Sequence, residues 1–280
     1  MEITSIYLLI FFAALLHALW NIIIKSLNNS LVGIAVKVFF QSIIFFPIIF
    51  IVQPPQGLTW FYLVCSSILH SIYFILLGNM YNRGDITVIY PIARGCAPVF
   101  VTIISLIFLQ DSISLVGIIG IITVSFGLVL LSLESFKIEM NIKIIGISLF
   151  IALIISIYTF TDGAGVRSAD MASTYIVWNF FLGGWISIGY VFFRNKKELF
   201  ELQLMDLMYI LLATIISFTA YAIIIWSMKH VPIGFVSSMR ESSIIFASLI
   251  GYYFLKEKIG YIRLLSGFIF FIGVYLIYTS

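Results

Sequence analysis

The residues of this chain that could do chemistry are charged side chains placed inside long apolar runs. Lys37, Arg94, Arg240 and Glu241 each lie well inside such a run, and Asp162 lies near one end of another. A charge at membrane depth costs about 2.5–3.5 kcal/mol on insertion scales, so each of these residues needs a partner or a ligand. A guanidinium keeps its charge, and its planar fork binds an acidic group through two parallel hydrogen bonds. Three cations against two anions therefore indicate a site for an anion, or for a zwitterion with a carboxylate or phosphonate group.

The two arginines occupy matching places in an internal repeat. An interval of 146 residues separates Arg94 from Arg240, Asp111 from Glu257, and Gly127 from Gly273. Because a repeat gives both arginines equivalent places, we expect them to face each other's half across a cavity near the membrane midplane. Glu241 follows Arg240 directly and points about 100° away from it on a helix. We therefore expect Glu241 to pair with another cation, such as Lys37 or Arg94.

Polar residues at helical spacing extend this candidate site. His17 and Asn21 share one helix face with Trp20 beside them, and Tyr158 and Asp162 repeat that spacing 141 residues later. The candidate substrate-binding residues are Arg94, Arg240, Glu241, His17, Trp20, Asn21, Lys37, Tyr90, Tyr158, Asp162 and Trp178. Proton coupling through His17, Asp162 or Glu241 is open, and the sequence does not choose among the three.

Several of these polar residues also have a structural interpretation. A histidine inside a span, such as His17 or His70, can simply bond to a neighbouring helix. Lys37 lies close enough to the end of its run for its ammonium to reach the interface. Asp111 and Glu257 are expected to cap the helices that follow them.

The elements that position these residues are membrane-spanning helices. Hydrophobic residues make up 62% of the 280-residue chain and charged residues 10%, against about 45–50% and 25% in soluble domains. A spanning helix needs about 20 mostly apolar residues. The chain contains ten such runs, at roughly 5–25, 31–52, 59–81, 86–109, 113–133, 143–163, 172–193, 207–229, 232–255 and 261–278. We expect an all-α membrane protein with no soluble domain.

Lysine and arginine in the loops predict the orientation of these spans. The loops after the odd-numbered spans carry ten such residues, and the opposite loops carry only Arg167 and Lys229. The positive-inside rule then places both termini outside a cell inner (cytoplasmic) membrane that the chain crosses many times. Five spans per half is an odd number, so residues 139–280 enter the membrane inverted relative to residues 1–138. This predicts two inverted five-helix repeats around a central cavity.

The fifth and tenth spans differ from the others because their interiors carry small residues in place of charges. Gly120 and Gly127 lie in the fifth span, and Ser266, Gly267 and Gly273 lie in the tenth. Small residues allow helix backbones to approach closely. We expect these two spans to pack as supports, while the other eight line the cavity.

Several functional classes are disfavoured by what the sequence lacks. Cys65 and Cys96 lie alone in apolar runs, which predicts neither a disulfide framework nor a metal site. No phosphate-binding loop and no Gly-x-Ser-x-Gly nucleophile motif occurs, so we expect neither direct ATP use nor enzymatic activity. The basic residues sit between apolar runs rather than in a patch, which disfavours nucleic acid as a partner. No cofactor is expected.

Three segments together resemble the EamA-type branch of the drug/metabolite transporter superfamily. They are His17-Ala-Leu-Trp-Asn21 with Lys25, the stretch from Arg94 through Asp111 to Gly127, and the stretch from Arg240-Glu241 through Phe254-Leu-Lys-Glu257 to Gly273. The resemblance covers the whole chain and implies small-molecule transport, commonly efflux of amino acids or other metabolites, by alternating access without ATP. Some relatives with this opening segment are associated with phosphonate utilisation. One departure is Asp111, which is shorter than its counterpart Glu257.

The leading interpretation is a secondary active transporter that exports a small anionic or zwitterionic metabolite, such as an amino acid or a phosphonate. Its expected partners are that substrate and the lipid bilayer, with the protein a monomer or a homodimer. The alternatives are an uptake carrier for the same class, and a passive channel or structural membrane subunit. A membrane enzyme acting on lipids is the least favoured alternative.

Overall fold

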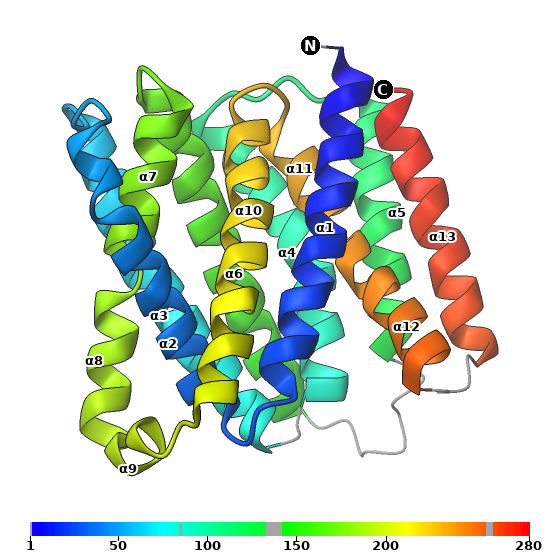
Figure 1. Ribbon diagram of the computed structural model, residues 1–280. Helices are drawn as coiled ribbons and strands as arrows, with labels where there is room; N and C mark the ends of the chain where they lie inside the picture. Colours follow the sequence, from blue (N-terminus) through cyan, green and yellow to red (C-terminus); the bar gives the residue numbers. More distant parts are fainter. Residues whose placement is uncertain (1, 84–85, 133–141, 256–259) are drawn as a thin grey trace. The chain divides into compact units, whose positions relative to one another are not determined.

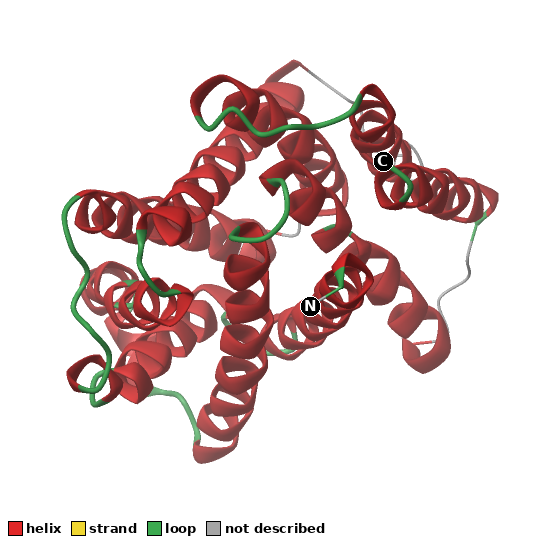
Figure 2. Ribbon diagram, turned by 90° about the horizontal axis from the view of Figure 1, so that it is seen from above, coloured by secondary structure: helices red, strands yellow, loops and turns green. Residues whose placement is uncertain are grey.

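The regular structure of the described chain is entirely helical. The computed structural model describes residues 2–83, 86–132, 142–255 and 260–280, and Figure 2 shows helices and loops but no strand among them. The predicted repeat boundary at residues 138/139 lies outside these ranges, and so does the predicted cap Glu257.

Each of the ten predicted spans carries a helix or a broken helix. The helices are α1 (Ile3–Lys25), α2 (Ser30–Phe45) with a 3-10 turn η1 (Ile48–Phe50), α3 (Leu58–Arg83), α4 (Ile86–Phe108), α5 (Leu115–Ser132), α6 (Ile142–Ser168), α7 (Ala172–Leu182), α8 (Trp185–Arg194), α9 (Lys196–Phe200), α10 (Leu204–Met228), α11 (Ile233–Arg240), α12 (Ser242–Leu255) and α13 (Tyr261–Tyr278). Within the described residues nine spans are long and apolar enough to cross a membrane, and α5 is a shorter apolar helix. The all-α, ten-span prediction is confirmed.

Besides the second span, where η1 follows α2, two spans are interrupted inside the apolar run. The seventh breaks between α7 and α8 at Gly183-Gly184, where the Gly184 amide donates to Ser42 Oγ of α2 at 3.0 Å. A Cβ on Gly184 would collide with the carbonyl oxygen of Val38, so only glycine allows this close approach. The ninth breaks at Glu241, between α11 and α12. Broken helices expose backbone ends at membrane depth, which is tolerated only where protein or a cavity satisfies them.

The helices form two compact units, and each unit takes helices from both halves of the sequence. Unit 1 contains Met1–Ala14, Asp85–Phe160 and His230–Ser280, and unit 2 contains Leu15–Gly84 and Thr161–Lys229. The helices α1 and α6 therefore each contribute one part to unit 1 and the other part to unit 2. Nearness in the sequence therefore does not decide the packing alone, although α4 packs on α5 and α2 packs on α3.

The predicted support helices α5 and α13 pack closely on small residues in unit 1. A Cβ on Gly120 would lie 2.9 Å from the carbonyl oxygen of Gly273, and one on Gly127 would lie 3.0 Å from that of Ser266. These contacts confirm the predicted packing. Gly267 is different, because a Cβ there would meet no atom within 4 Å.

Both chain ends lie at one end of unit 1. Thr4 near the start of α1 lies 3.4 Å from the Tyr278 hydroxyl at the end of α13, and the Tyr7 ring contacts the Tyr278 ring. Figure 1 shows the N and C labels at that end. An even number of crossings requires this arrangement.

The cap predicted for Asp111 was assigned to the wrong helix. Its carboxylate accepts from the backbone amide of Ile233, the first residue of α11, at 3.1 Å. The first turn of α5 is instead capped by Ser114, whose hydroxyl accepts from the Gly117 amide at 3.0 Å. A carboxylate stabilises any nearby helix start, so sequence proximity does not fix which helix it caps.

Candidate functional site

The two repeat-related arginines converge on one carboxylate in unit 1. Arg94 Nε of α4 lies 2.5 Å from Glu241 Oε2, and Arg240 Nη2 lies 3.7 Å from Glu241 Oε1. All three side chains are almost fully buried, with relative exposures of 1% for Arg94, 2% for Arg240 and 0% for Glu241. The predicted pairing of Glu241 with Arg94 is confirmed. The expectation that Glu241 would avoid its neighbour is wrong, because each arginine takes one of its two oxygens.

The break between α11 and α12 explains how adjacent residues share a contact. Arg240 is the last residue of α11, where the helix dipole favours a cation, and Glu241 precedes the first turn of α12, where it favours an anion. Arg94 is held from other directions, because its Nη2 donates to Ser243 Oγ at 3.2 Å and its guanidinium lies over the Tyr90 ring. Within α4, Pro98 has no amide to donate to the Arg94 carbonyl.

Glu241 has acceptor capacity that the described residues leave unused. Within the described chain, Oε2 lies 2.5 Å from Arg94 Nε and Oε1 lies 3.7 Å from Arg240 Nη2, which is one guanidinium contact for each oxygen. A carboxylate can accept about four hydrogen bonds. The formal charges of Arg94, Arg240 and Glu241 sum to one positive charge. This cluster could therefore accept a further anionic group at the arginines and a donor at Glu241.

Lys37 is enclosed in unit 2 and does not reach an interface. Its Nζ donates to Ser217 Oγ of α10 at 2.9 Å and lies 4.1 Å from the Trp20 ring centre and 4.8 Å from that of Phe74. The side chain is 1% exposed. The interpretation in which Lys37 extends to the membrane surface is therefore wrong. Two aromatic faces and one hydroxyl stabilise a buried ammonium without neutralising it.

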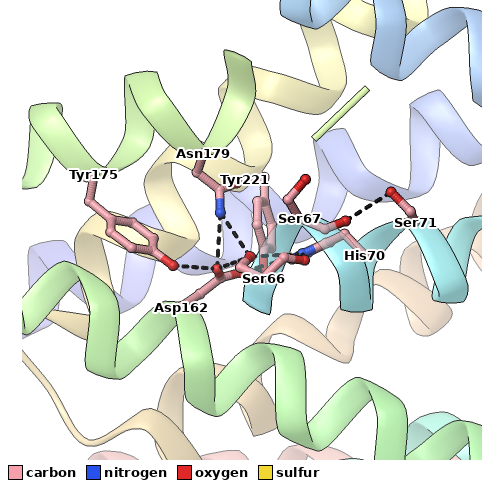
Figure 3. A network of polar contacts seen from close by, with 8 residues as sticks. All are labelled: Ser66, Ser67, His70, Ser71, Asp162, Tyr175, Asn179 and Tyr221. Atoms are coloured by element: carbon pink, nitrogen blue, oxygen red, sulfur yellow. Dashed lines mark hydrogen bonds and ion pairs between the residues drawn. The ribbon is translucent and has the colours of Figure 1, made fainter. Parts of the chain in front are cut away.

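Asp162 lies at the centre of a second polar cluster in unit 2 (Figure 3). Its Oδ1 accepts from Ser66 Oγ at 2.5 Å, from Tyr175 at 2.9 Å and from Asn179 Nδ2 at 3.1 Å. Its Oδ2 accepts from the Tyr221 hydroxyl and lies 3.7 Å from His70 Nε2. Four helices, α3, α6, α7 and α10, contribute to the cluster. The donors fill the capacity of the carboxylate, in contrast to Glu241.

The remaining predicted site residues make contacts within and between helices. His17 Nδ1 accepts from Trp20 Nε1 at 3.3 Å, and Asn21 donates to the His17 carbonyl and accepts from Tyr81 at 2.8 Å. Trp178 packs on the Trp60 ring, and Tyr158 is buried in unit 1. Lys37 brings Trp20 into its cluster, because its Nζ lies over the Trp20 ring.

Sequence reasoning did not select five members of the Asp162 cluster as site residues: Ser66, His70, Tyr175, Asn179 and Tyr221. Tyr175 and Asn179 share a helix face through their four-residue spacing, which is a signal that the sequence contains. Ser66 and Tyr221 have no such signal, because serine and tyrosine are common in spans and only the packing of α3 and α10 brings them together. No group of three or more metal-binding side chains occurs in the described chain.

The whole chain resembles known proteins at two levels. A crystal structure of a protein aligns with a TM-score of 0.74 at 13% sequence identity, covering 98% of this chain and 98% of that chain. At that identity the likeness shows the shared fold alone. No curated protein matches the sequence.

The model of the EamA-like transporter family matches the chain twice, over residues 4–133 and 142–279. The two matches together take in nearly the whole sequence and both sets of spans. The chain therefore belongs to the EamA-like transporter family, within the drug/metabolite transporter superfamily.

Proposed function

We propose that this multi-pass membrane transporter exports a small anionic or zwitterionic metabolite, such as an amino acid or a phosphonate, by alternating access. The observation that carries the proposal is the convergence of Arg94 and Arg240 on the single buried carboxylate of Glu241. The two cations and one anion would accept one more acidic group without leaving a buried charge uncompensated.

The chemistry of the cluster also accounts for a zwitterion. A guanidinium fork binds a carboxylate or phosphonate through paired hydrogen bonds. The unused acceptor capacity of Glu241 would receive the ammonium group of the same substrate. An amino acid or an aminophosphonate presents both groups within one small molecule. A substrate without an acidic group would gain nothing from the arginines.

The proposal is tested by counterflow in proteoliposomes with a panel of radiolabelled amino acids and aminophosphonates. Arg94→Lys and Arg240→Lys keep the charge but lose the fork. Losing a charge-assisted hydrogen bond in a dry site costs about 1.5–3 kcal/mol, so affinity should fall roughly ten- to a hundredfold. Glu241→Gln should reduce transport less, and it should affect zwitterions more than simple anions.

Arg194→Lys is the control, since Arg194 is an exposed arginine at the end of α8 whereas the cluster is buried. If both cluster variants transport as well as this control, the arginines are structural and the site proposal fails. Counterflow also distinguishes a carrier from a passive channel. Only a carrier can accumulate labelled substrate against its gradient in exchange for unlabelled substrate on the other side of the membrane. Uptake by inside-out vesicles that exceeds uptake by right-side-out vesicles would support export, and the reverse would favour an uptake carrier.

A further inference from the structure

The hydroxyl of Ser42 in α2 lies inside the break of the seventh span, in the place of one backbone hydrogen bond. In a continuous α-helix the Gly184 amide would donate to the Phe180 carbonyl, four residues earlier. Here the Gly184 amide donates to Ser42 Oγ at 3.0 Å, and Ser42 Oγ donates to the Phe180 carbonyl at 3.2 Å. Ser42 is fully buried. One hydroxyl from a neighbouring helix therefore stands between the donor and the acceptor of a helical bond.

The backbone on either side of this insertion is helical. The Gly183 amide donates to the Asn179 carbonyl at 3.0 Å, and the Ile188 amide donates to the Gly184 carbonyl at 3.1 Å. Sharp kinks in helices commonly occur where a side chain inserts into the hydrogen-bond ladder. The break between α7 and α8 is therefore attributable to Ser42 as well as to the two glycines.

The groups that meet at the break have a second way to pair. Ser42 Oγ also lies 3.3 Å from the carbonyl oxygen of Val38 in its own helix, and its single proton can go to either carbonyl. With that proton on the Val38 carbonyl, the Gly184 amide is able to donate to Phe180. The seventh span would then be continuous. Both arrangements make two hydrogen bonds with the same two donors. The exchange therefore leaves no buried donor unpaired, which is the costly outcome inside a protein.

The helices on the two sides of the break are held differently within unit 2. α7 packs on α2, α3 and α10, and its Tyr175 and Asn179 donate to Asp162 of α6. α8 packs on α2, α3 and the short α9 that follows it, and it exposes Trp185 and Phe193. Figure 1 shows α7 and α8 as separate helices. A change at the break would therefore move α8, while α7 stays attached through the Asp162 cluster.

The two glycines of the break differ in the room around them. A Cβ on Gly184 would collide with the Val38 carbonyl oxygen and would lie 2.6 Å from Ser42 Oγ. A Cβ on Gly183 would meet only the Asn179 carbonyl oxygen, at 3.2 Å. The close approach of α2 to the break thus requires glycine at the second position and not at the first. The broken arrangement can be disfavoured in two independent ways, by removing the hydroxyl or by adding a methyl group.

We propose that the break between α7 and α8 is a conformational switch with a broken and a continuous state. Ser42 accepts the Gly184 amide in the broken state, and the Phe180 carbonyl accepts it in the continuous state. Loop charge predicts that α8 ends on the cytoplasmic side, so the switch would move the inner end of this span. Its use in alternating access rests on the proposed function, whereas the existence of two states does not.

The two states are measured by the distance between the predicted cytoplasmic ends of α2 and α8. α8 has 10 residues and is about 15 Å long. Kinks at insertions exceed about 20°, so closing or opening one moves the end of α8 by more than about 5 Å. Spin labels at Asn28 and Arg194, which are both exposed, report this distance by double electron–electron resonance in reconstituted protein lacking Cys65 and Cys96. A pair at the other end of unit 2, on Gln53 and Met171, should not change.

Two variants should shift the distance between Asn28 and Arg194. Ser42→Ala leaves the Phe180 carbonyl as the remaining acceptor for the Gly184 amide, and Gly184→Ala places a methyl group against α2. We expect both to move the main distance by at least about 5 Å. Gly184→Ala keeps the Ser42 hydroxyl, so it tests the switch even where Ser42→Ala lowers the folded yield.

The matched controls change the same region without touching the exchange. Ser67→Ala removes a hydroxyl that donates to the Leu182 carbonyl beside the break at 2.9 Å, and Gly183→Ala adds a methyl group where there is room. Both controls should keep the distance of the unaltered protein. An unchanged distance in Ser42→Ala and Gly184→Ala as well would overturn the switch.

A second measurement asks whether the switch takes part in transport. A carrier must pass through both states, so a variant that favours one of them should turn over slowly. In proteoliposomes loaded with the amino acid panel, Ser42→Ala should lower the maximal counterflow rate at least about fivefold, and Ser67→Ala should not. A Ser42→Ala protein with a shifted distance and an unchanged rate would overturn the role in transport. Absence of counterflow in the unaltered protein would count against the proposed function and leave the distance result standing.

Discussion

At the scale of single residues, the buried charges of this chain are stabilised in different ways. Asp162 is satisfied by hydrogen bonds from neutral side chains, Glu241 by two guanidiniums, and Lys37 by two rings and a hydroxyl. Arg167 and Lys229, the two cations in the loops predicted to lie outside, have structural roles in unit 2. Arg167 Nε donates to the Met228 carbonyl at the end of α10, and Lys229 Nζ donates to the Ala169 carbonyl just past the end of α6.

Lys37 permits a test of stability against function. Replacing a buried charged group by an apolar one of similar size is often neutral or stabilising, because desolvation of the charge is avoided. We expect Lys37→Met to keep or raise the melting temperature and, if Lys37 contributes to substrate binding, to lose anion transport. Ser217→Ala is the comparison, because it removes the hydrogen-bond acceptor and should cost about 1–3 kcal/mol. A Lys37→Met protein that melts below Ser217→Ala would show that the ammonium is structural.

At the scale of elements, α5 and α13 form a contact that follows the sequence repeat. Gly127 and Gly273 are repeat partners, and Gly120 corresponds to Ser266 in the same register. Gly127 packs on the backbone at Ser266, and Gly120 packs on the backbone at Gly273, so each contact is the counterpart of the other. Two inverted halves produce this kind of self-complementary crossing.

The crossing predicts which glycine substitutions the fold tolerates. Gly120→Leu and Gly273→Leu place a side chain against backbone atoms closer than 3 Å, and overpacking typically costs about 1–3 kcal/mol. We expect a reduced folded yield and a lower melting temperature before any change in substrate preference. Gly267→Leu, on α13 like Gly273, is the matched control, since a Cβ at Gly267 meets no atom within 4 Å. If Gly120→Leu folds like this control but alters selectivity, α5 lines the substrate path.

At the scale of the whole molecule, the halves of the sequence and the compact units are different divisions. The family matches follow the sequence halves, at residues 4–133 and 142–279. Unit 1 instead combines α4 and α5 with α11, α12 and α13, and unit 2 combines α2 and α3 with α7, α8 and α10. Each unit thus contains repeat-related helices from both halves. The proposed anion cluster lies in unit 1, and the Asp162 cluster lies in unit 2.

Orientation in the membrane is a whole-molecule prediction that rests on loop charge. We expect both termini outside and the α8–α9 connection in the cytoplasm. Cysteines placed singly at Ser280 and Lys196, after replacement of Cys65 and Cys96, should react from opposite sides of intact cells with an impermeant maleimide. Both positions are exposed, so lack of reaction would not reflect burial in the protein. Labelling of Lys196→Cys from outside would reverse the predicted orientation.

Much of the fold could be predicted because the relevant physics is local in sequence. Transfer of about 20 apolar residues into lipid depends on composition and length, which identified all ten spans. The repeat and the small residues of α5 and α13 are also visible along the chain. The deep placement of Arg94, Arg240 and Glu241 followed from their positions inside apolar runs, and the structure confirms their burial.

The sequence by itself therefore determined the ten membrane spans, the repeat and the burial of Arg94, Arg240 and Glu241. Tertiary structure decided the partner of each charge. Glu241 contacts Arg94 from 147 positions earlier, Asp162 contacts Ser66 from 96 positions earlier, and Asp111 caps a helix 122 positions later. These choices depend on how each helix is rotated and which helices cross. Hydrophobicity of a span does not encode either property, because lipid accepts any rotation of an apolar helix and only contacts with other helices select one.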